Sequence, residues 1–414
     1  MMYDFNKDKP LIMHIDLNSA FATTEQQAHP SLRGKPMGVT NRISKECCVI
    51  AASYEAKALG IKVGMRRSEA MAICPKFILL ETDPPKYNAV YQKLIKIMHD
   101  YSPNIKMKSI DEGIIDFHGM ETVLSGRSLT DIGYEIKQRV KQDIGEWMRI
   151  NIGIGPNRFL AKQAAGWHKP DGLDVLDYHN LVDYYQEVRL TDLSGIARRN
   201  EARLNAYGIM TALDFLNASE FTLKKQVFRG ITGLYWYQRL RGIEIDDYET
   251  KLGMVGRQWV VKDPSAKDSY LLPCLSFLCE TTGAKLRYRQ VEARGICAWA
   301  GYVNGESWQA KHMYKTTCYS NQDIYKRALE LFNSRLRGDI KIIGIYCYGL
   351  ETSSRNQVNL FEDINKKQWL TKAMDEINDF YGSFTVYSAG SLEGKKLIKQ
   401  KIPFGGTEYF DLLI

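Results

Sequence analysis

Apolar runs and polar breaks alternate along the first 175 residues in the manner of an α/β domain. Residues 11–15 are apolar and end at Asp16, the pattern of a buried strand with a carboxylate at its end. Residues 105–117 alternate like a hairpin, with Asp111 and Glu112 near the middle. A further strand is predicted over residues 150–154, and helices over residues 20–28, 53–59, 87–101, 127–147 and 158–166.

The remaining chain has a different rhythm. Residues 176–243 have a mostly helical pattern, and the charged residues that follow are typical of a linker. A second α/β domain is predicted beyond them, because strands alternate again with helices. Its strands are expected over residues 295–302 and 341–349, and its helices over residues 271–288 and 323–336. Polar residues 351–356 open a C-terminal tail.

Composition limits the class of protein. The 414 residues exceed one ordinary core, and roughly 100–200 residues per domain predicts two to four domains. No apolar run approaches the ~20 residues that cross a bilayer, and residues 1–10 are too polar for a signal peptide. The eight cysteines are scattered without a CxxC pair, which favours free thiols in the cytoplasm and argues against structural zinc.

Charge adds a candidate partner. The formal net charge is +8, and residues 251–350 hold 15 Lys and Arg against 8 Asp and Glu, so almost the whole excess lies in the second α/β domain. A concentrated basic surface suits a phosphate backbone. A solvated basic face is the alternative explanation of the same count.

Three carboxylates suggest a metal site. Asp16 stands at a strand end, and Asp111 and Glu112 interrupt a second apolar run. Carboxylates gathered in apolar surroundings repel one another, and divalent cations relieve that repulsion. Mg²⁺ prefers such hard oxygen ligands, and two ions can activate a 3′-hydroxyl and stabilise a leaving pyrophosphate. Asp16 by itself would read as a turn residue, whereas an acidic doublet inside an apolar hairpin is costly without a function.

Four segments together carry a resemblance to a known family. The chain resembles the Y-family, translesion DNA polymerases, and within them the catalytic subunit of bacterial polymerase V and its plasmid and Gram-positive relatives. The segments are residues 14–21 (HIDLNSAF), 48–60 (CVIAASYEAKALG), 109–112 (SIDE) and 153–172, which contains GIGPN, AK and KPDG.

The resemblance implies an α/β (α+β), multidomain right-hand polymerase. The palm is expected at residues 1–19 and 85–175, and the fingers at residues 20–84. The thumb is expected at residues 176–243, a linker at residues 244–253 and the little finger at residues 254–350. A tail, residues 351–414, completes the chain.

The resemblance also assigns site residues. Asp16, Asp111 and Glu112 match the carboxylates that hold two Mg²⁺ ions, with Mn²⁺ as an alternative, and Asp111 and Glu112 are the catalytic pair. Leu17 matches the residue that offers a main-chain carbonyl to a metal. The residues that match the nucleotide contacts are Phe21, the steric gate against ribose, with Tyr54, Lys57 and Lys162 at the triphosphate.

Each of these residues also has an ordinary structural explanation, and some positions depart from the family. Phe21 could be a core residue and Lys162 a solvated helix lysine. Lys57 stands where many relatives carry arginine, and it acts as a point charge rather than a bidentate fork. Ala20 replaces an aromatic residue before the gate, and Gly113 replaces the usual alanine after Glu112.

Two further segments suggest DNA and protein partners. Residues 190–216 resemble a helix-hairpin-helix, whose turn at Gly195, Ile196 and Ala197 would aim backbone N–H groups at a DNA phosphate. An ordinary helical turn is the alternative. The peptide Gln357-Val358-Asn359-Leu360-Phe361 resembles the motif that docks bacterial polymerases on the sliding clamp, through Gln357, Leu360 and Phe361. Trp299, Tyr302 and Trp308 could stack on bases or belong to the core.

The predicted activity is template-directed addition of deoxynucleotides to a primer 3′ end. The family implies low fidelity and lesion bypass in DNA repair and the SOS response. The partners are primer-template DNA, deoxynucleoside triphosphates, the sliding clamp and accessory SOS proteins, without a membrane. Two rivals stay open: a nucleotide cyclase or template-independent nucleotidyl transferase on a related palm, and a non-catalytic DNA-binding module.

Overall fold

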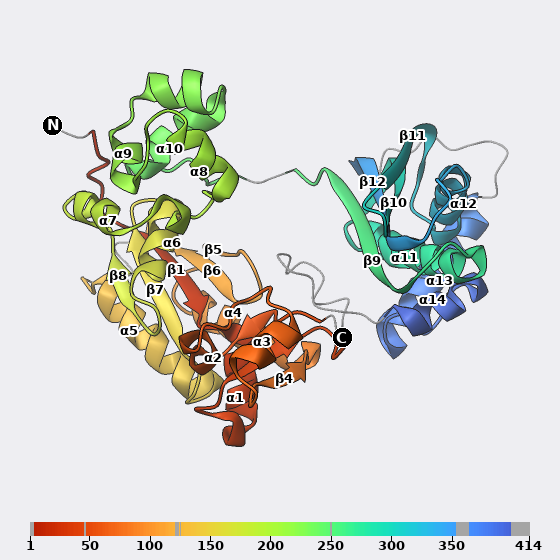
Figure 1. The fold of residues 1–414 in the computed structure, drawn as a ribbon, viewed down its shortest axis with the longest axis horizontal. Helices are drawn as coiled ribbons and strands as arrows, with labels where there is room; N and C mark the ends of the chain where they lie inside the picture. Colours follow the sequence, from red (N-terminus) through yellow and green to blue (C-terminus); the bar gives the residue numbers. More distant parts are fainter. Residues whose placement is uncertain are drawn as a thin grey trace. The chain divides into compact units, whose positions relative to one another are not determined.

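The chain folds into two compact units, which the computed structural model describes over residues 4–44, 47–120, 124, 126–248, 251–352 and 364–398 (Figure 1). The first unit ends at Tyr248 and the second begins in the segment that follows. Among the described helices, none combines the length and the apolar character that crossing a bilayer requires. All eight cysteines lie in the described residues, where each is a free thiol.

A five-stranded sheet is the centre of the first unit. Its strands lie in the order β5-β6-β1-β7-β8, and all neighbours are antiparallel except the parallel pair β7 and β8. The predicted hairpin is confirmed as the pair β5 and β6. The strands are β1 (Ile12–Leu17), β5 (Ile105–Met107), β6 (Glu112–Asp116), β7 (Ile150–Gly155) and β8 (Leu173–Val175).

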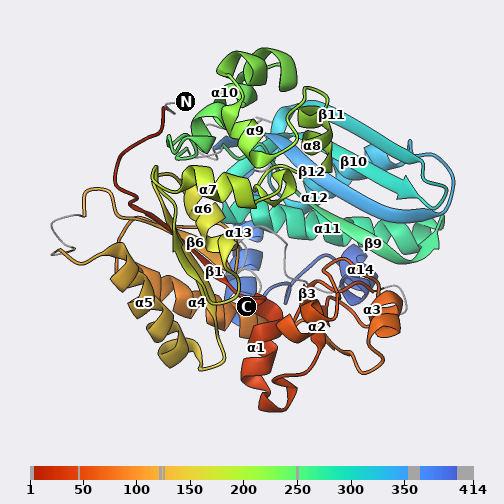
Figure 2. The ribbon, with the colours of Figure 1, turned by 60° about the vertical axis from the view of Figure 1, so that its left-hand side comes forward.

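Helices cover both faces of this sheet. Helices α4 (Pro84–His99) and α5 (Leu129–Arg139) pack on one face, where Met13 and Ile15 join their core. Residues 127–147 were expected as one helix, but the α-helix ends at Arg139 and a π-helical turn, η2 (Val140–Ile144), follows. Helix α6 (Arg158–Trp167) lies on the opposite face against β7 and β1 (Figure 2).

Small residues let α6 approach the sheet closely. A methyl group added at Gly153 would overlap the backbone of Ala161 and Ala165, and one at Gly155 would overlap Ala161. The helix begins where Asn157 caps it, because the Asn157 side chain accepts a hydrogen bond from Leu160 N at 2.7 Å. Strand, break and helix agree with the sequence pattern, and together they fix where α6 crosses the sheet.

A smaller sheet precedes α4 in the chain. Its order is β3-β2-β4, with β2 and β4 parallel. The helix predicted over residues 20–28 is confirmed. The elements are α1 (Ala20–Ala28), η1 (Pro30–Leu32), β2 (Met37–Thr40), β3 (Ala51–Ala52), α2 (Tyr54–Ala58), α3 (Arg67–Ile73) and β4 (Ile78–Glu81).

The last part of the first unit is helical, as predicted for residues 176–243. Its core surrounds Tyr185, Phe215 and Trp236, which are buried. The elements are α7 (Leu181–Glu187), η3 (Leu190–Asp192), α8 (Arg198–Asn205), α9 (Ala212–Asn217), η4 (Thr222–Val227) and α10 (Ile231–Leu240).

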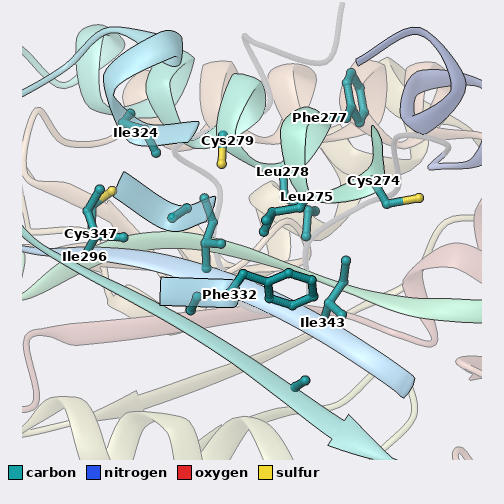
Figure 3. Packing of buried hydrophobic residues seen from close by; sticks show 14 of the residues in the cluster. Cys274, Leu275, Phe277, Leu278, Cys279, Ile296, Ile324, Phe332, Ile343 and Cys347 are labelled. Atoms are coloured by element: carbon teal, nitrogen blue, oxygen red, sulfur yellow. The ribbon is translucent and has the colours of Figure 1, made fainter. Parts of the chain in front are cut away.

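The second unit is a four-stranded antiparallel sheet, order β11-β10-β12-β9, covered by helices. Figure 3 shows its core, in which Leu275 and Leu278 of α11 lie near Phe332 of α12 and Ile343 of β12. The elements are β9 (Met254–Ser265), α11 (Asp268–Tyr288), β10 (Val291–Tyr302), β11 (Ser307–Cys318), α12 (Asn321–Phe332) and β12 (Ile340–Thr352). The pattern of the sequence missed β9 and β11.

The described part of the tail packs on this second unit. Helix α13 (Ile364–Tyr381) is tied to α11 by Arg287, whose Nε donates to Asp375 at 2.6 Å. The Ser276 and Ser391 hydroxyls lie 2.7 Å apart at η6 (Ala389–Ser391), which leads into α14 (Leu392–Leu397).

The three aromatic residues that could have stacked on bases differ in their surroundings. Tyr302 is buried and donates to Leu336 O at 2.8 Å, and Trp308 packs edge-on against Phe332. Trp299 lies over Gly344 on the opposite face of the sheet, where a methyl group would overlap the indole. The core interpretation therefore holds for Tyr302 and Trp308.

Candidate active site

Strand register brings the first two acidic residues together. Asp16 of β1 is paired with Glu112 of β6, so both side chains point to one face of the sheet. Asp111 immediately precedes β6, and its carbonyl accepts a hydrogen bond from Leu17 N at 2.8 Å. The ends of β1 and β6 are therefore locked to each other at the point where the three predicted carboxylates meet.

Glu112 is held by two donors. Lys162 Nζ of α6 lies 2.7 Å from Glu112 Oε2, and His14 Nε2 lies 3.2 Å from the same oxygen. Burial opposes the charge, but the hydrogen bonds from His14 and Lys162, with the charge of Lys162, lower the pKa of Glu112 to about 2. Glu112 is thus a carboxylate at neutral pH, and Lys162 is bonded to it although the lysine side chain is partly exposed.

Asp111 is in the opposite electrostatic position. Its burial, together with the nearby charges of Asp16 and Glu112, raises its pKa, while a hydrogen bond from Ser109 opposes the rise. Asp16 is paired with Lys169, whose Nζ lies 2.9 Å from Asp16 Oδ1. Mutual repulsion of carboxylates, which the sequence predicted, is present at Asp111.

The side chains that could share one cation differ from the predicted trio. His14, Asp16 and Glu112 each offer a ligand atom within 4.8 Å of the others. Asp111 is outside that group, and its carboxylate accepts a hydrogen bond from Ser109 Oγ. Sequence reasoning singled out the carboxylates and overlooked His14, although strand alternation places His14 on the face of Asp16.

A pocket of about 320 Å³ opens beside Asp16 and Asp111. Phe21 of α1 lines it, and the Phe21 ring stacks on Tyr87 with ring centroids 4.5 Å apart. Tyr87 in turn donates to Glu25 at 2.8 Å, so the ring beneath Phe21 is fixed. Phe21 is therefore half-buried and rigidly supported. It packs against Tyr87 as a core residue would, and it also forms part of the pocket wall.

Two predicted nucleotide contacts come from α2. Tyr54 and Lys57 line the same pocket, and Lys57 Nζ lies 4.6 Å from the centre of the Tyr54 ring. Burial, followed by repulsion from Lys169, lowers the pKa of Lys57, while Asp16 opposes that shift. Burial and the charge of Asp16 raise the pKa of Tyr54 to about 12. Cations and a phenol therefore face the pocket from one side.

Lys169 is a lining residue that sequence reasoning quoted only as part of a motif. It contributes a second ammonium group to the pocket, from a part of the sequence far from Lys57. Lys162 and Glu112 are not among the described residues that line the pocket. Lys169 follows Lys162 by seven residues, which in a continuous helix would place both on one face. Helix α6 ends at Trp167, however, so the sequence pattern does not give the position of Lys169.

The three residues of the predicted DNA-binding turn differ in their exposure. Gly195 has a φ of +99°, which favours glycine, and Ala197 caps α8 and is exposed. Ile196 is buried, and its N–H is occupied by Leu193 O at 2.9 Å. The residues of the clamp-like peptide, Gln357, Leu360 and Phe361, lie outside the described residues.

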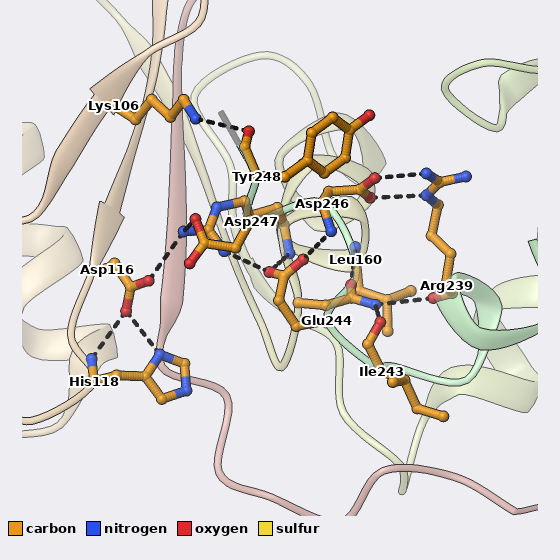
Figure 4. A network of polar contacts seen from close by, with 12 residues as sticks. Lys106, Asp116, His118, Leu160, Arg239, Ile243, Glu244, Asp246, Asp247 and Tyr248 are labelled. Atoms are coloured by element: carbon orange, nitrogen blue, oxygen red, sulfur yellow. Dashed lines mark hydrogen bonds and ion pairs between the residues drawn. The ribbon is translucent and has the colours of Figure 1, made fainter. Parts of the chain in front are cut away.

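A polar network anchors the start of the predicted linker near this site (Figure 4). Arg158, the first residue of α6, donates to Glu244 at 2.8 Å, and its Nη2 lies 2.6 Å from Asp247 and 3.2 Å from Asp116. Arg239 donates from two nitrogens to Asp246. The segment that leaves the first unit is thus bonded to α6 and β6, the elements that carry Lys162 and Glu112.

Comparisons with known proteins give the class. Residues 15–166 match the impB/mucB/samB family, and residues 261–360 match the impB/mucB/samB family C-terminal domain. The chain is 30% identical to a DNA polymerase IV of Moorella thermoacetica over 96% of this chain and 98% of that protein. It is 29% identical to a DNA polymerase IV of Pelotomaculum thermopropionicum over 94% of this chain and 97% of that protein.

The fold agrees with this result. A Y-family DNA polymerase chimera of Dbh and Dpo4 superposes with a TM-score of 0.70 at 24% identity, covering 82% of this chain and 99% of that one. The fold is that of a multidomain right-hand polymerase. The chain belongs to the Y family of translesion DNA polymerases and is a DNA-directed DNA polymerase. The relatives quoted are named DNA polymerase IV, so the predicted closeness to polymerase V stays a prediction.

Proposed function

We propose that the chain extends a primer by a two-metal mechanism at the pocket beside Asp16, Asp111 and Glu112. The observation that carries this proposal is the convergence of Asp16 of β1 and Asp111, which directly precedes β6, with Lys57 and Lys169 around one cavity. Acidic groups serve as metal ligands and lysines as triphosphate contacts, which is the division that nucleotidyl transfer needs. The palm is assigned to the five-stranded sheet, residues 1–19 and 85–175.

The donor set fits Mg²⁺. Asp16, Asp111 and Glu112 supply carboxylate oxygens, and Leu17 is assigned a main-chain carbonyl, all hard ligands. The raised pKa of Asp111 fits a site whose carboxylates lack sufficient positive charge. When bound, two such ions lower the pKa of the primer 3′-hydroxyl and stabilise the leaving pyrophosphate. Mn²⁺ is the alternative ion.

The chain's own residues bind and select the nucleotide. Lys57 and Lys169 neutralise the triphosphate, and the Tyr54 hydroxyl, which stays protonated, can donate to a phosphate oxygen. Phe21 is assigned the face of the sugar, where its ring would collide with a 2′-hydroxyl. Lys162 acts through Glu112, which it keeps ionised and in place.

The remaining assignments concern DNA and partners. The fingers are placed at residues 20–84, the thumb at residues 176–243, the little finger at residues 254–350 after a linker at 244–253, and a tail at residues 351–414. Gly195 and Ala197 can offer N–H groups to a phosphate, whereas Ile196 supports the turn from the core. The proposal also includes docking on the sliding clamp through residues 357–361, interaction with accessory SOS proteins, and a cytoplasmic location.

The decisive test is primer extension with Mg²⁺ on a defined template. We expect addition directed by the template, and loss of synthesis by at least about 100-fold in Asp111→Asn and Glu112→Gln, while affinity for primer-template DNA is retained. Asp116→Asn is the matched control, because Asp116 lies on the same strand and contacts Arg158 rather than the pocket. Synthesis without a template would favour a cyclase or transferase, and synthesis that survives both substitutions would refute the metal assignment.

A further inference from the structure

His14 is a buried histidine that the proposed mechanism does not use. It lies on β1 two residues before Asp16, and its strand partners are Ile114 of β6 and Gly153 of β7. Its residue exposure is 1%. Because Ile114 is directly opposite, Glu112 is the diagonal neighbour of His14 on the same face, within reach of its ring.

The hydrogen bond to Glu112 has a defined direction. Glu112 Oε2 already accepts a hydrogen bond from Lys162 Nζ at 2.7 Å, so it is the acceptor for His14 as well, and His14 Nε2 carries the hydrogen that points to Oε2 at 3.2 Å. His14 Nδ1 is buried and has no hydrogen-bond partner among the described residues. A ring with one proton, on Nε2, therefore leaves no buried N–H unsatisfied, which is the less costly arrangement.

Both donors reach the same oxygen of Glu112. Lys162 Nζ approaches Oε2 from α6 at 2.7 Å, and His14 Nε2 approaches it from β1. Lysine has a long, flexible side chain, and that of Lys162 is 39% exposed, whereas the His14 ring is buried on β1, a central strand of the sheet. The histidine is thus the rigid member of the pair and determines the orientation of the carboxylate.

We propose that His14 is a positioning residue that holds Glu112 Oε2 and so presents the other carboxylate oxygen to the catalytic cations. The inference rests on the proposed two-metal function. It also explains why His14 lies close to Asp16 and Glu112: His14 is there as a hydrogen-bond donor and not as a metal ligand. A ring nitrogen that donates to a carboxylate, as Nε2 does, has no lone pair for a cation.

The experiment compares two substitutions at one position. His14→Leu removes the donor and keeps an apolar side chain, and His14→Gln keeps an N–H at similar reach. Single-nucleotide extension is measured against Mg²⁺ and against deoxynucleotide concentration. We expect His14→Leu to raise the half-saturating Mg²⁺ concentration about 10-fold or more, with the nucleotide KM changed less than about twofold, and His14→Gln to recover most of the loss.

Mn²⁺ binding provides a readout that needs no catalysis. Titration of the full-length protein with Mn²⁺, followed by electron paramagnetic resonance of the free ion, should show the same order: wild type, then His14→Gln, then His14→Leu. Ile12→Val is the matched control, since Ile12 lies on the same strand face, packs with Ile114 and Ala161, and is paired across the strands with Asp116 rather than Glu112. Its Mn²⁺ affinity should equal that of the wild type, and thermal melting should show that every variant is folded.

The outcomes separate this inference from the proposed function. Wild-type protein that needs no divalent ion would refute the proposed function itself. Metal-dependent wild-type synthesis with unchanged Mg²⁺ and Mn²⁺ dependence in His14→Leu would overturn only the role of His14. An equal loss in His14→Gln and His14→Leu would make His14 a packing residue. A shift of metal preference from Mn²⁺ to Mg²⁺ in both variants would make His14 a metal ligand. Either result would overturn the positioning role.

Discussion

Glu112 is the residue where the two sheet strands and helix α6 of the active site meet. Its neighbours on the sheet are Asp16, across the strands, and His14, on the diagonal, while Lys162 reaches it from the helix. Asp111, one position earlier, experiences burial and repulsion instead. The pKa values of these adjacent carboxyl groups are thus shifted in opposite directions, because their partners differ.

Phe21 is expected to discriminate against ribonucleotides. Its ring lines the pocket and is fixed by stacking on Tyr87. Phe21→Ala should raise the incorporation of ribonucleotides relative to deoxynucleotides by about 10-fold or more, since loss of a steric clash is worth at least ~1.4 kcal/mol. Competing single-nucleotide additions measure the ratio. Tyr87→Phe keeps the supporting ring and should leave the ratio unchanged; unaltered sugar selectivity in Phe21→Ala would refute the gate.

Lys285 is expected to destabilise the second unit at neutral pH. Burial, followed by repulsion from Arg257 and Arg289, lowers the pKa of Lys285 to about 8 from the ordinary value of 10.5. Between these two values the unfolded chain binds more protons than the folded one, so stability rises with pH. Lys285→Met should therefore increase the free energy of unfolding at pH 7 by about 1–3 kcal/mol.

That gain should shrink as the pH rises from about 8 towards 10.5, because the folded lysine then loses its charge. Urea unfolding of the full chain at several pH values measures it. Lys341→Met, at an exposed position of β12 in the same unit, is the control and should show no such trend. A stability difference independent of pH would mean that packing rather than charge is responsible.

At the scale of elements, close contact between α6 and β7 positions Lys162. Gly153 and Gly155 face the helix backbone, so the sequence pattern of a strand followed by glycines and a capped helix sets the separation of the two elements. Gly113 has a similar explanation, because a methyl group there would meet the side chains of Met98 and Met107. The departure from the family's alanine at this position is therefore matched by methionine packing.

Gly153→Ala should push α6 away from the sheet. The added methyl group would overlap the backbone of Ala161 and Ala165, so we expect a loss of about 1–3 kcal/mol in unfolding free energy and a marked loss of synthesis. Gly166→Ala, on helix α6 itself, is a matched control, because no atom lies within 4 Å of the new methyl group. It should be neutral or slightly stabilising. Equal stability of the two variants would show that the helix can shift without cost.

At the scale of the whole molecule, the start of the linker belongs to the first unit. Arg158 binds Glu244, Asp247 and Asp116, so the segment up to Tyr248 is bonded to the elements of the active site (Figure 4). The predicted linker began at residue 244, because the run of acidic residues there reads as solvated. Its partners come from α6 and α10, and only folding brings them together.

Arg158→Met should release this segment. Loss of the guanidinium leaves three carboxylates without their cation, so we expect faster amide hydrogen exchange over residues 244–248 and a decrease of about 2–3 kcal/mol in stability of the first unit. Hydrogen exchange followed by mass spectrometry measures both. Arg189→Met, which removes an exposed pair with Asp192, should leave exchange at residues 244–248 as in the wild type. Unchanged exchange in Arg158→Met would show that Asn157 and Arg239 suffice to hold the segment.

The local pattern of the sequence determined most elements near the site. Apolar runs and the breaks between them predicted β1, the β5–β6 hairpin and β7, and the break at Gly155 to Asn157 predicted α6, because strands and caps depend on neighbouring residues. It missed β9 and β11, whose described residues mix exposed polar and apolar side chains, since edge strands of this sheet lack a clear period. Motif order, rather than periodicity, led to the family.

Tertiary structure decided the contacts between distant segments. That His14 groups with Asp16 and Glu112 depends on the register of two strands about 100 residues apart. The pairing of Lys169 with Asp16 and the anchoring of residues 244–248 by Arg158 have the same origin. Register and packing follow from the burial of whole faces, so no single segment of sequence carries them.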